Sequence, residues 1–225
     1  DMVNRRIPGS YWLMMALIPV PGVGYANYET GKNLAAWLDS QLLAGHMWKA
    51  TKTWDPEGIL STVPAISTAL SGVLLGHFLR SKFSDAEKVA WIFSAGAFAV
   101  FIGSVWSIFF PLNKSIWSSS YVVYTSGLAL MFFAFCYWIA DVQGYKKWAK
   151  PFIIYGLNAI TVFAGSGLMA KIMGMIKVAG ADGKEISSKE YLYQTFLVPY
   201  LDPYNASLAF ALLFVLFWLG ILWVL

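Results

Sequence analysis

The sequence is poor in cysteine and in charge, and each shortage excludes a class of protein. Among 225 residues there is one cysteine, Cys136, and it lies inside an apolar run. A disulfide framework is therefore excluded, and the thiol is interpreted as a small core residue. Charged residues make up 12% of the chain, whereas ordinary soluble domains carry about 25%. Since 58% of the residues are hydrophobic, the composition indicates a polytopic membrane protein.

Histidines and the usual catalytic motifs are also scarce. HExxH, GxSxG, P-loop, CxxC and GxGxxG patterns do not occur in a usable context, and no metal site is predicted. Of the two histidines, His77 lies one turn from the end of an apolar segment, and His46 lies beside Met47 and Trp48. We interpret both as interfacial residues rather than catalytic bases.

Six apolar segments predict an all-α fold in a single membrane domain, residues 1–225. A helix that crosses a bilayer needs about 20 apolar residues, and the segments are 7–20, 59–79, 89–110, 121–140, 152–175 and 206–225. The first segment is short for a crossing, and the last ends at Leu225. We therefore expect about six membrane helices in a fragment of a longer protein, with the first and last helices cut short.

One further helix is predicted between the first two segments. In residues 33–44 the spacing of apolar residues places Leu34, Trp37, Leu38 and Leu42 on one face. This pattern is typical of an amphipathic helix that lies along the membrane surface.

Basic residues predict how the chain is oriented. They cluster before the first segment, between the second and third, and between the fourth and fifth. These clusters fall on one side if every segment crosses once, and the positive-inside rule makes that side cytoplasmic. Asp55 and Lys114 then face outward. The net charge of +4 is explained by these loops, so no nucleic-acid partner is predicted.

An acidic segment, Trp54–Gly58 (WDPEG), directly precedes the apolar run 59–79. Asp55 is a residue type that caps helix N-termini, Pro56 suits a first helical turn, and Glu57 would face the positive end of the helix dipole. Two interpretations remain open. The segment either begins a well-capped membrane helix or uses its two carboxylates to hold a polar substrate.

A second polar segment, residues 110–121, follows the third apolar run. Asn113 and Lys114 offer donors to a sugar or an acyl carbonyl, and Trp117 offers a stacking face. The alternative is structural: Lys114 forms an ion pair with Asp55 or Glu57 and joins the two loops.

Asn158 lies about two turns inside the fifth apolar segment. A polar side chain at membrane depth is costly unless paired, which makes Asn158 a functional candidate. Hydrogen bonding between helices is the alternative.

Small and hydroxyl residues follow one face of the second segment. They are Ser61, Ala65, Thr68, Gly72 and Gly76. Such a face allows a neighbouring helix to approach closely. Alternatively, its hydroxyls line a polar path through a helix kinked at Pro64.

Several of these stretches, in this order and spacing, resemble the heparan-alpha-glucosaminide N-acetyltransferase family and its bacterial homologues, which are multi-helix membrane acyltransferases. The stretches are 54–62 (WDPEGILST), 111–118 (PLNKSIWS), 120–122 (SYV), 141–144 (DVQG), 151–152 (PF) and 156–160 (GLNAI). The resemblance covers nearly the whole chain, but only the C-terminal half of a family member.

The resemblance implies an activity that the residues alone do not indicate. In this family an acetyl group passes from cytosolic acetyl-CoA, the co-substrate, to the amine of a glucosamine on the far side of the membrane. The family's essential histidine lies in its N-terminal half, and neither His46 nor His77 matches that motif. We therefore assign no catalytic residue and expect the chain alone to be inactive. The resemblance also implies a bacterial inner membrane and partners that include the missing N-terminal helices.

Two other functions compete with this one. The chain can be a non-catalytic accessory subunit of a larger membrane complex, which fits its apolar surface and the missing histidine. It can also be a transporter that uses Ser61, Thr68 and Asn158 as a polar path. We expect the chain to lie in the lipid bilayer as part of an oligomer or of a larger complex.

Overall fold

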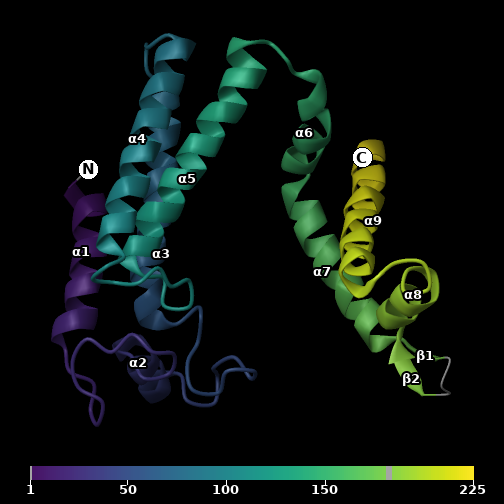
Figure 1. Ribbon diagram of the computed structural model, residues 1–225, viewed down its shortest axis with the longest axis horizontal. Helices are drawn as coiled ribbons and strands as arrows, with labels where there is room; N and C mark the ends of the chain where they lie inside the picture. The colour runs from purple at the N-terminus through teal and green to yellow at the C-terminus, as the bar shows by residue number, and fades with distance from the viewer. Residues whose placement is uncertain (1, 181–183) are drawn as a thin grey trace. The chain divides into compact units, whose positions relative to one another are not determined.

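The computed structural model describes residues 2–180 and 184–225, and the chain is mostly helical (Figure 1). It divides into two compact units, Asp1–Gly144 and Tyr145–Leu225. We call them the first and the second unit and describe each by itself.

The first unit is a set of helices joined by loops of very different length. Its helices are α1 (Met2–Leu17), α2 (Leu34–Leu42), α3 (Ile59–Leu79), α4 (Asp85–Trp106) and α5 (Ser119–Tyr137), and α5 continues as a π-helical turn over Trp138–Val142. Long helices α3, α4 and α5 run alongside one another, and the short α2 lies at the end where α3 begins (Figure 1).

Helices α4 and α5 form the most intimate pair, because glycines bring their backbones into contact. A Cβ atom on Gly96 would lie 2.8 Å from the carbonyl oxygen of Gly127, and one on Gly103 would lie 2.7 Å from the amide nitrogen of Tyr124. A Cβ on Gly72 or Gly76 of α3 would meet open space. Within the described part of the chain no helix packs closely on these α3 glycines, and small residues bring α4 and α5 together instead.

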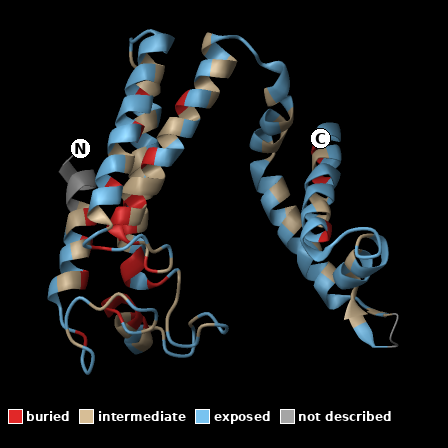
Figure 2. Ribbon diagram, viewed as in Figure 1, coloured by how far each residue is buried: buried red, intermediate tan, exposed pale blue. Residues whose placement is uncertain are grey.

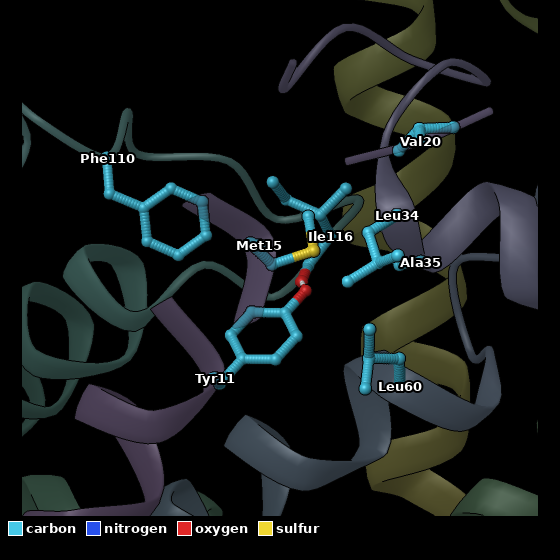
Figure 3. Packing of buried hydrophobic residues seen from close by; sticks show 8 residues of the cluster. All are labelled: Tyr11, Met15, Val20, Leu34, Ala35, Leu60, Phe110 and Ile116. Carbon is cyan, nitrogen blue, oxygen red and sulfur yellow. Dashed lines mark hydrogen bonds between the residues drawn. The ribbon is translucent and has the colours of Figure 1, made fainter. Parts of the chain in front are cut away.

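The core of the first unit lies at the end where α3 and α5 begin. It comprises Tyr11, Met15, Val20, Leu34, Ala35, Leu60, Phe110 and Ile116 (Figure 3). The Tyr11 hydroxyl donates a hydrogen bond to the carbonyl of Ile116 at 2.5 Å, which ties α1 to the loop between α4 and α5. Figure 2 shows that buried residues concentrate here, while large apolar residues such as Phe98, Phe101 and Phe132 are exposed along the helices. A helix that is apolar all round suits a lipid environment.

Helix α2 confirms the helix predicted in residues 33–44. Asn33 caps it: its side-chain oxygen accepts the N–H of Ala36, and its amide group donates to the carbonyl of Glu29, both at 2.9 Å. The apolar face is turned partly into the protein, since Leu34 is buried while Leu42 is 63% exposed.

The second unit contains the remaining helices and a small hairpin. A 3₁₀ turn (Lys147–Ala149) leads into α6 (Lys150–Leu157) and α7 (Ala159–Met175), and α8 (Ser188–Phe196) precedes α9 (Pro203–Val224). Strands β1 (Lys177–Ala179) and β2 (Glu185–Ser187) pair antiparallel, with Val178 opposite Ile186. This hairpin departs from the all-α prediction.

Four helical segments are long and apolar enough to cross a membrane: α3, α4, Ser119–Val142 and α9. Residues 147–157 and 159–175 make a fifth if they count as one span, but they are bent by 70°. The prediction of apolar membrane helices is confirmed for four or five segments, whereas about six were predicted. The predicted continuous helix 152–175 is wrong, because the chain breaks at Asn158.

Candidate functional site

Helix α3 does not begin as its sequence predicts. Its N-cap residue is Gly58, which has no side chain to offer, and Asp55 and Pro56 lie before the helix. The cap comes from α2, where one carboxylate oxygen of Asp39 accepts the backbone N–H of Ile59 at 3.0 Å. Asp39 thus performs, from twenty residues away, the role predicted for Asp55.

Asp39 is a buried carboxylate that the sequence reasoning missed. Its side chain and backbone are 1% exposed, and a Cβ on Gly58 would lie 1.9 Å from its second oxygen. Burial raises the pKa of Asp39, the hydrogen bond from Ile59 lowers it, and the nearby charge of Asp55 raises it further. One signal was present in the sequence: Asp39 lies four residues after Ala35, on the face of α2 that is buried.

Asp55 organises the loop that leads to α3. One carboxylate oxygen accepts the N–H of Trp48, and the other accepts the N–H of Glu57, both at 2.9 Å. Both oxygens are therefore already engaged in holding residues 48–57 in a compact turn. The side chain is half-buried.

This loop borders a cavity of about 470 Å³ that is open to solvent. We call it the Glu57 pocket, and its lining residues are His46, Trp48, Asp55, Pro56 and Glu57. Glu57 is exposed, and its carboxylate forms no ion pair within the described part of the chain. His46 places Nδ1 3.3 Å from the carbonyl of Ala44, so the tautomer protonated there leaves Nε2 as an acceptor. Carboxylates beside an aromatic face suit a cationic ligand such as a protonated amine.

Asn113 and Lys114 lie in the loop between α4 and α5. This loop and the loop that leads to α3 are at the same end of the first unit (Figure 1). The side-chain oxygen of Asn113 accepts the N–H of Ser115 at 2.8 Å, and its backbone amide nitrogen donates to the Ser118 hydroxyl at 3.0 Å. Lys114 is exposed. Among the described residues it forms no ion pair with Asp55 or Glu57, so the loops are not joined in that way.

Trp117 fastens this loop to α3. Its indole N–H donates to the Thr68 hydroxyl at 3.1 Å, and its ring packs edge-on against Tyr121 with centroids 5.7 Å apart. The backbone at Trp117 has a φ of +49°, a left-handed conformation that is strained for a bulky side chain. Trp117, Asn113 and Lys114 are not among the residues that line the Glu57 pocket.

The predicted polar path along α3 uses hydroxyls that already have partners. Ser61 is buried and donates to the carbonyl of Gly58 at 3.0 Å, and Thr68 accepts the indole N–H of Trp117. The first contact lies within the opening turn of α3, and the second holds α3 to the loop between α4 and α5.

Asn158 belongs to the second unit and lies at the bend between α6 and α7. Its side-chain amide donates to the carbonyl of Ile154 at 3.0 Å, one turn earlier in the same helix. The Ile154 carbonyl also accepts the backbone N–H of Asn158 at 3.2 Å, so the side chain and the backbone of Asn158 both bind the last turn of α6.

Helices apolar enough to cross a bilayer, together with a carboxylate-lined pocket where one of them begins, define an integral membrane protein with a polar site at a helix terminus. No family model matches the chain. It is similar to heparan-alpha-glucosaminide N-acetyltransferase of Mus musculus, with 29% identity over 220 residues that cover 84% of this chain and 33% of that protein. It is also similar to the Homo sapiens protein of the same name, with 32% identity over 185 residues that cover 68% and 28%.

The resemblance to the heparan-alpha-glucosaminide N-acetyltransferase family is thereby confirmed. The chain matches only part of these proteins, a region of the C-terminal type. The chain spans about a third of the length of the curated relatives it matches.

Proposed function

We propose that this chain is the C-terminal part of a membrane acetyltransferase that moves an acetyl group from cytosolic acetyl-CoA to an amino sugar on the outer side. The observation that carries the proposal is the similarity to two N-acetyltransferases over 84% and 68% of the chain. No catalytic residue is assigned, and we expect the chain to be inactive without the rest of the protein.

The Glu57 pocket is the place where this chain would receive the acceptor. An amino sugar carries a protonated amine before it reacts, and a carboxylate beside an aromatic ring binds such a cation. Glu57 has its carboxylate exposed, and Trp48 is 56% exposed. Asp55 would contribute its charge while it holds the loop in shape.

The other predicted residues take supporting roles in this proposal. Lys114 and the side-chain amide of Asn113 would donate to sugar hydroxyls from the same end of the first unit, and Trp117 would offer an aromatic edge. Asn158 would supply a polar contact within the membrane in the complete protein.

We further propose the placement of the chain in its membrane. Helix α1 would provide a sixth crossing if the bent pair α6 and α7 is counted as one. The side that carries Asp55 and Lys114 would face outward in a bacterial inner membrane, with the basic loops in the cytoplasm.

The test uses the full-length protein in liposomes, with acetyl-CoA on the cytoplasmic side and glucosamine on the other. Glu57→Gln and Lys114→Met are each expected to reduce acetyl transfer at least about tenfold, because a charge-assisted hydrogen bond is lost. The matched controls Glu185→Gln and Lys184→Met alter exposed residues of the second unit and should leave transfer unchanged. Equal activity in all four variants would remove Glu57 and Lys114 from the site.

A second candidate function rests on a groove along α3. A cavity of about 430 Å³ lies between α3 and α5, with Thr68, Gly72 and Ser126 in its lining. Small residues facing open space suit the approach of another membrane helix. This favours a non-catalytic accessory subunit that packs in a larger complex. Purification in mild detergent as a stable assembly without acetyl transfer would support it.

A further inference from the structure

Two cavities of opposite character adjoin on either side of α8 in the second unit. One has a volume of about 510 Å³ and polar lining residues that include Ser187, Lys189, Glu190 and Ser207. The other has a volume of about 250 Å³ and an entirely apolar lining that includes Met173, Leu192, Phe196 and Leu213. Phe210 of α9 lines both, so the two cavities are neighbours at this residue.

The polar cavity presents one positive and one negative group side by side. The Lys189 ammonium lies 6.0 Å from the centroid of the Phe210 ring, and no carboxylate in the described part of the chain lies within ion-pairing distance of it. Glu190 accepts a hydrogen bond from Gln194 through one oxygen at 3.1 Å, which leaves its second oxygen to accept another donor.

Two hydroxyls complete this polar lining. The Ser187 oxygen accepts the N–H of Glu190 at 3.2 Å, so its own hydrogen remains available to a ligand. Ser207 is exposed on α9. The cavity therefore offers an ammonium and hydroxyl donors to a phosphate, together with a carboxylate that suits an ammonium group.

The position of the cavities fits the boundary of a bilayer. The hairpin and α8 lie between the end of α7 at Met175 and the start of α9 at Pro203, and α9 is apolar enough to cross the membrane. A short amphipathic helix at the end of a span lies at the level of lipid headgroups. A polar cavity and an apolar cavity that meet at this level match a molecule with a charged head and an acyl chain.

We propose that these two cavities bind one glycerophospholipid with a phosphoethanolamine headgroup. Its phosphate contacts Lys189 and the serine hydroxyls, its ammonium donates to Glu190, and one acyl chain enters the apolar cavity past Phe210. A phosphoglycerol headgroup offers only neutral hydroxyls to the Glu190 carboxylate, and these form weaker hydrogen bonds than an ammonium group does. A phosphocholine headgroup has no N–H to donate to it.

The test measures lipid retention by the full-length protein in detergent. Native mass spectrometry follows phosphatidylethanolamine, phosphatidylglycerol and phosphatidylcholine, each added separately at the same concentration. Phosphatidylethanolamine is expected to be retained in preference to the other two. Lys189→Ala should weaken that retention about tenfold, as expected for the loss of a charge-assisted hydrogen bond. Lys184→Ala, which removes an exposed lysine outside the cavity, should not weaken it.

A second pair of variants tests the apolar cavity. Leu213 lines it and is 56% exposed, whereas Leu212 does not line it and is 54% exposed. Leu213→Trp should fill the cavity and weaken retention, while Leu212→Trp should not. Lys189→Arg should retain binding, and Glu190→Gln should abolish the preference for phosphatidylethanolamine over phosphatidylglycerol.

If one pair of variants, the lysine pair or the tryptophan pair, is not monodisperse in detergent, the other pair is used. Three outcomes would overturn the proposal. They are equal retention of the three lipids, a preference for phosphatidylglycerol in the unaltered protein, and equal effects of the two tryptophan variants. None of them depends on acetyl transfer, so this proposal and the proposed function succeed or fail separately.

Discussion

Two membrane helices in this chain come after an Asp-Pro sequence, and only one of them is capped by it. In α9 the carboxylate of Asp202 accepts the N–H groups of Tyr204 and Asn205 at 3.1 and 3.3 Å, and Pro203 occupies the first turn. In α3 the Asp55-Pro56 pair stops short of the helix, and the cap comes from Asp39. The same dipeptide therefore leads to a local cap in one unit and to a tertiary contact in the other.

The difference lies in the residues that come after the proline. Gly58 leaves room for a carboxylate from α2 to reach the first N–H of α3, while Asp55 is used to close the loop on Trp48. A helix capped from a distance is coupled to the element that caps it. The start of α3, helix α2 and the Glu57 pocket are therefore expected to gain or lose order together.

The largest effect is expected from Gly58→Ala. Its new methyl group would lie 1.9 Å from a carboxylate oxygen of Asp39, so the cap must separate or the helices must shift. We expect a loss of about 3 kcal/mol, the upper range for overpacking. Thermal unfolding in detergent measures it, with Gly72→Ala as the control, because a methyl group there meets open space. Equal melting temperatures for the two variants would contradict the close contact.

Asp39→Ala should have the next largest effect. It leaves the N–H of Ile59 without its partner inside the protein, which costs about 2 kcal/mol. Asp39→Asn keeps a side-chain oxygen that can accept this N–H, and it should retain most of the stability. If Asp39→Asn were as damaging as Asp39→Ala in the same unfolding experiment, the charge rather than the hydrogen bond would be the important feature.

Asp202→Ala should lower the melting temperature less than Asp39→Ala does. The cap of α9 is exposed, so water can replace the lost acceptor. Asp202→Asn serves as its conservative control. A loss that equals or exceeds that of Asp39→Ala would mean that local and distant caps contribute alike.

The smallest effect expected is a difference in pH dependence between the two caps. Burial raises the pKa of Asp39, so its contribution to the free energy of unfolding falls as pH rises from the ordinary carboxyl range through the raised value. Hydrogen bonds from Asn205 lower the pKa of Asp202, so its contribution is lost as pH falls below the ordinary range. Melting curves of Asp39→Asn and Asp202→Asn, recorded from about pH 3 to about pH 8, should therefore differ from the unaltered protein in opposite directions.

The apolar runs predicted most of the helices because hydropathy is a local property. Segments 59–79 and 206–225 correspond closely to α3 and α9. The break at Asn158 was not predicted, since Asn158 sits in an otherwise uninterrupted apolar run. Its side-chain amide donates to the carbonyl of Ile154 in the last turn of α6, a contact that hydropathy does not indicate.

The candidate site was predictable in its residue types and less so in their arrangement. The sequence indicated the acidic segment and the Asn-Lys loop, and the structure places both at one end of the first unit (Figure 1). Asp39 was not among the predicted site residues, and His46, interpreted from the sequence as an interfacial residue, lines the Glu57 pocket. A buried carboxylate on an apolar helix face was the one signal that pattern analysis passed over.

The contact between Gly96 and Gly127 also limits which parts of the first unit can move. Where backbone meets backbone, sliding one helix along the other forces main-chain atoms to collide, so α4 and α5 must travel as one rigid body. Any rearrangement within this unit has to occur where flexible side chains separate the neighbours. The boundary of this rigid pair with α3, where Gly72 and Ser71 border open grooves, is the surface where such motion costs least.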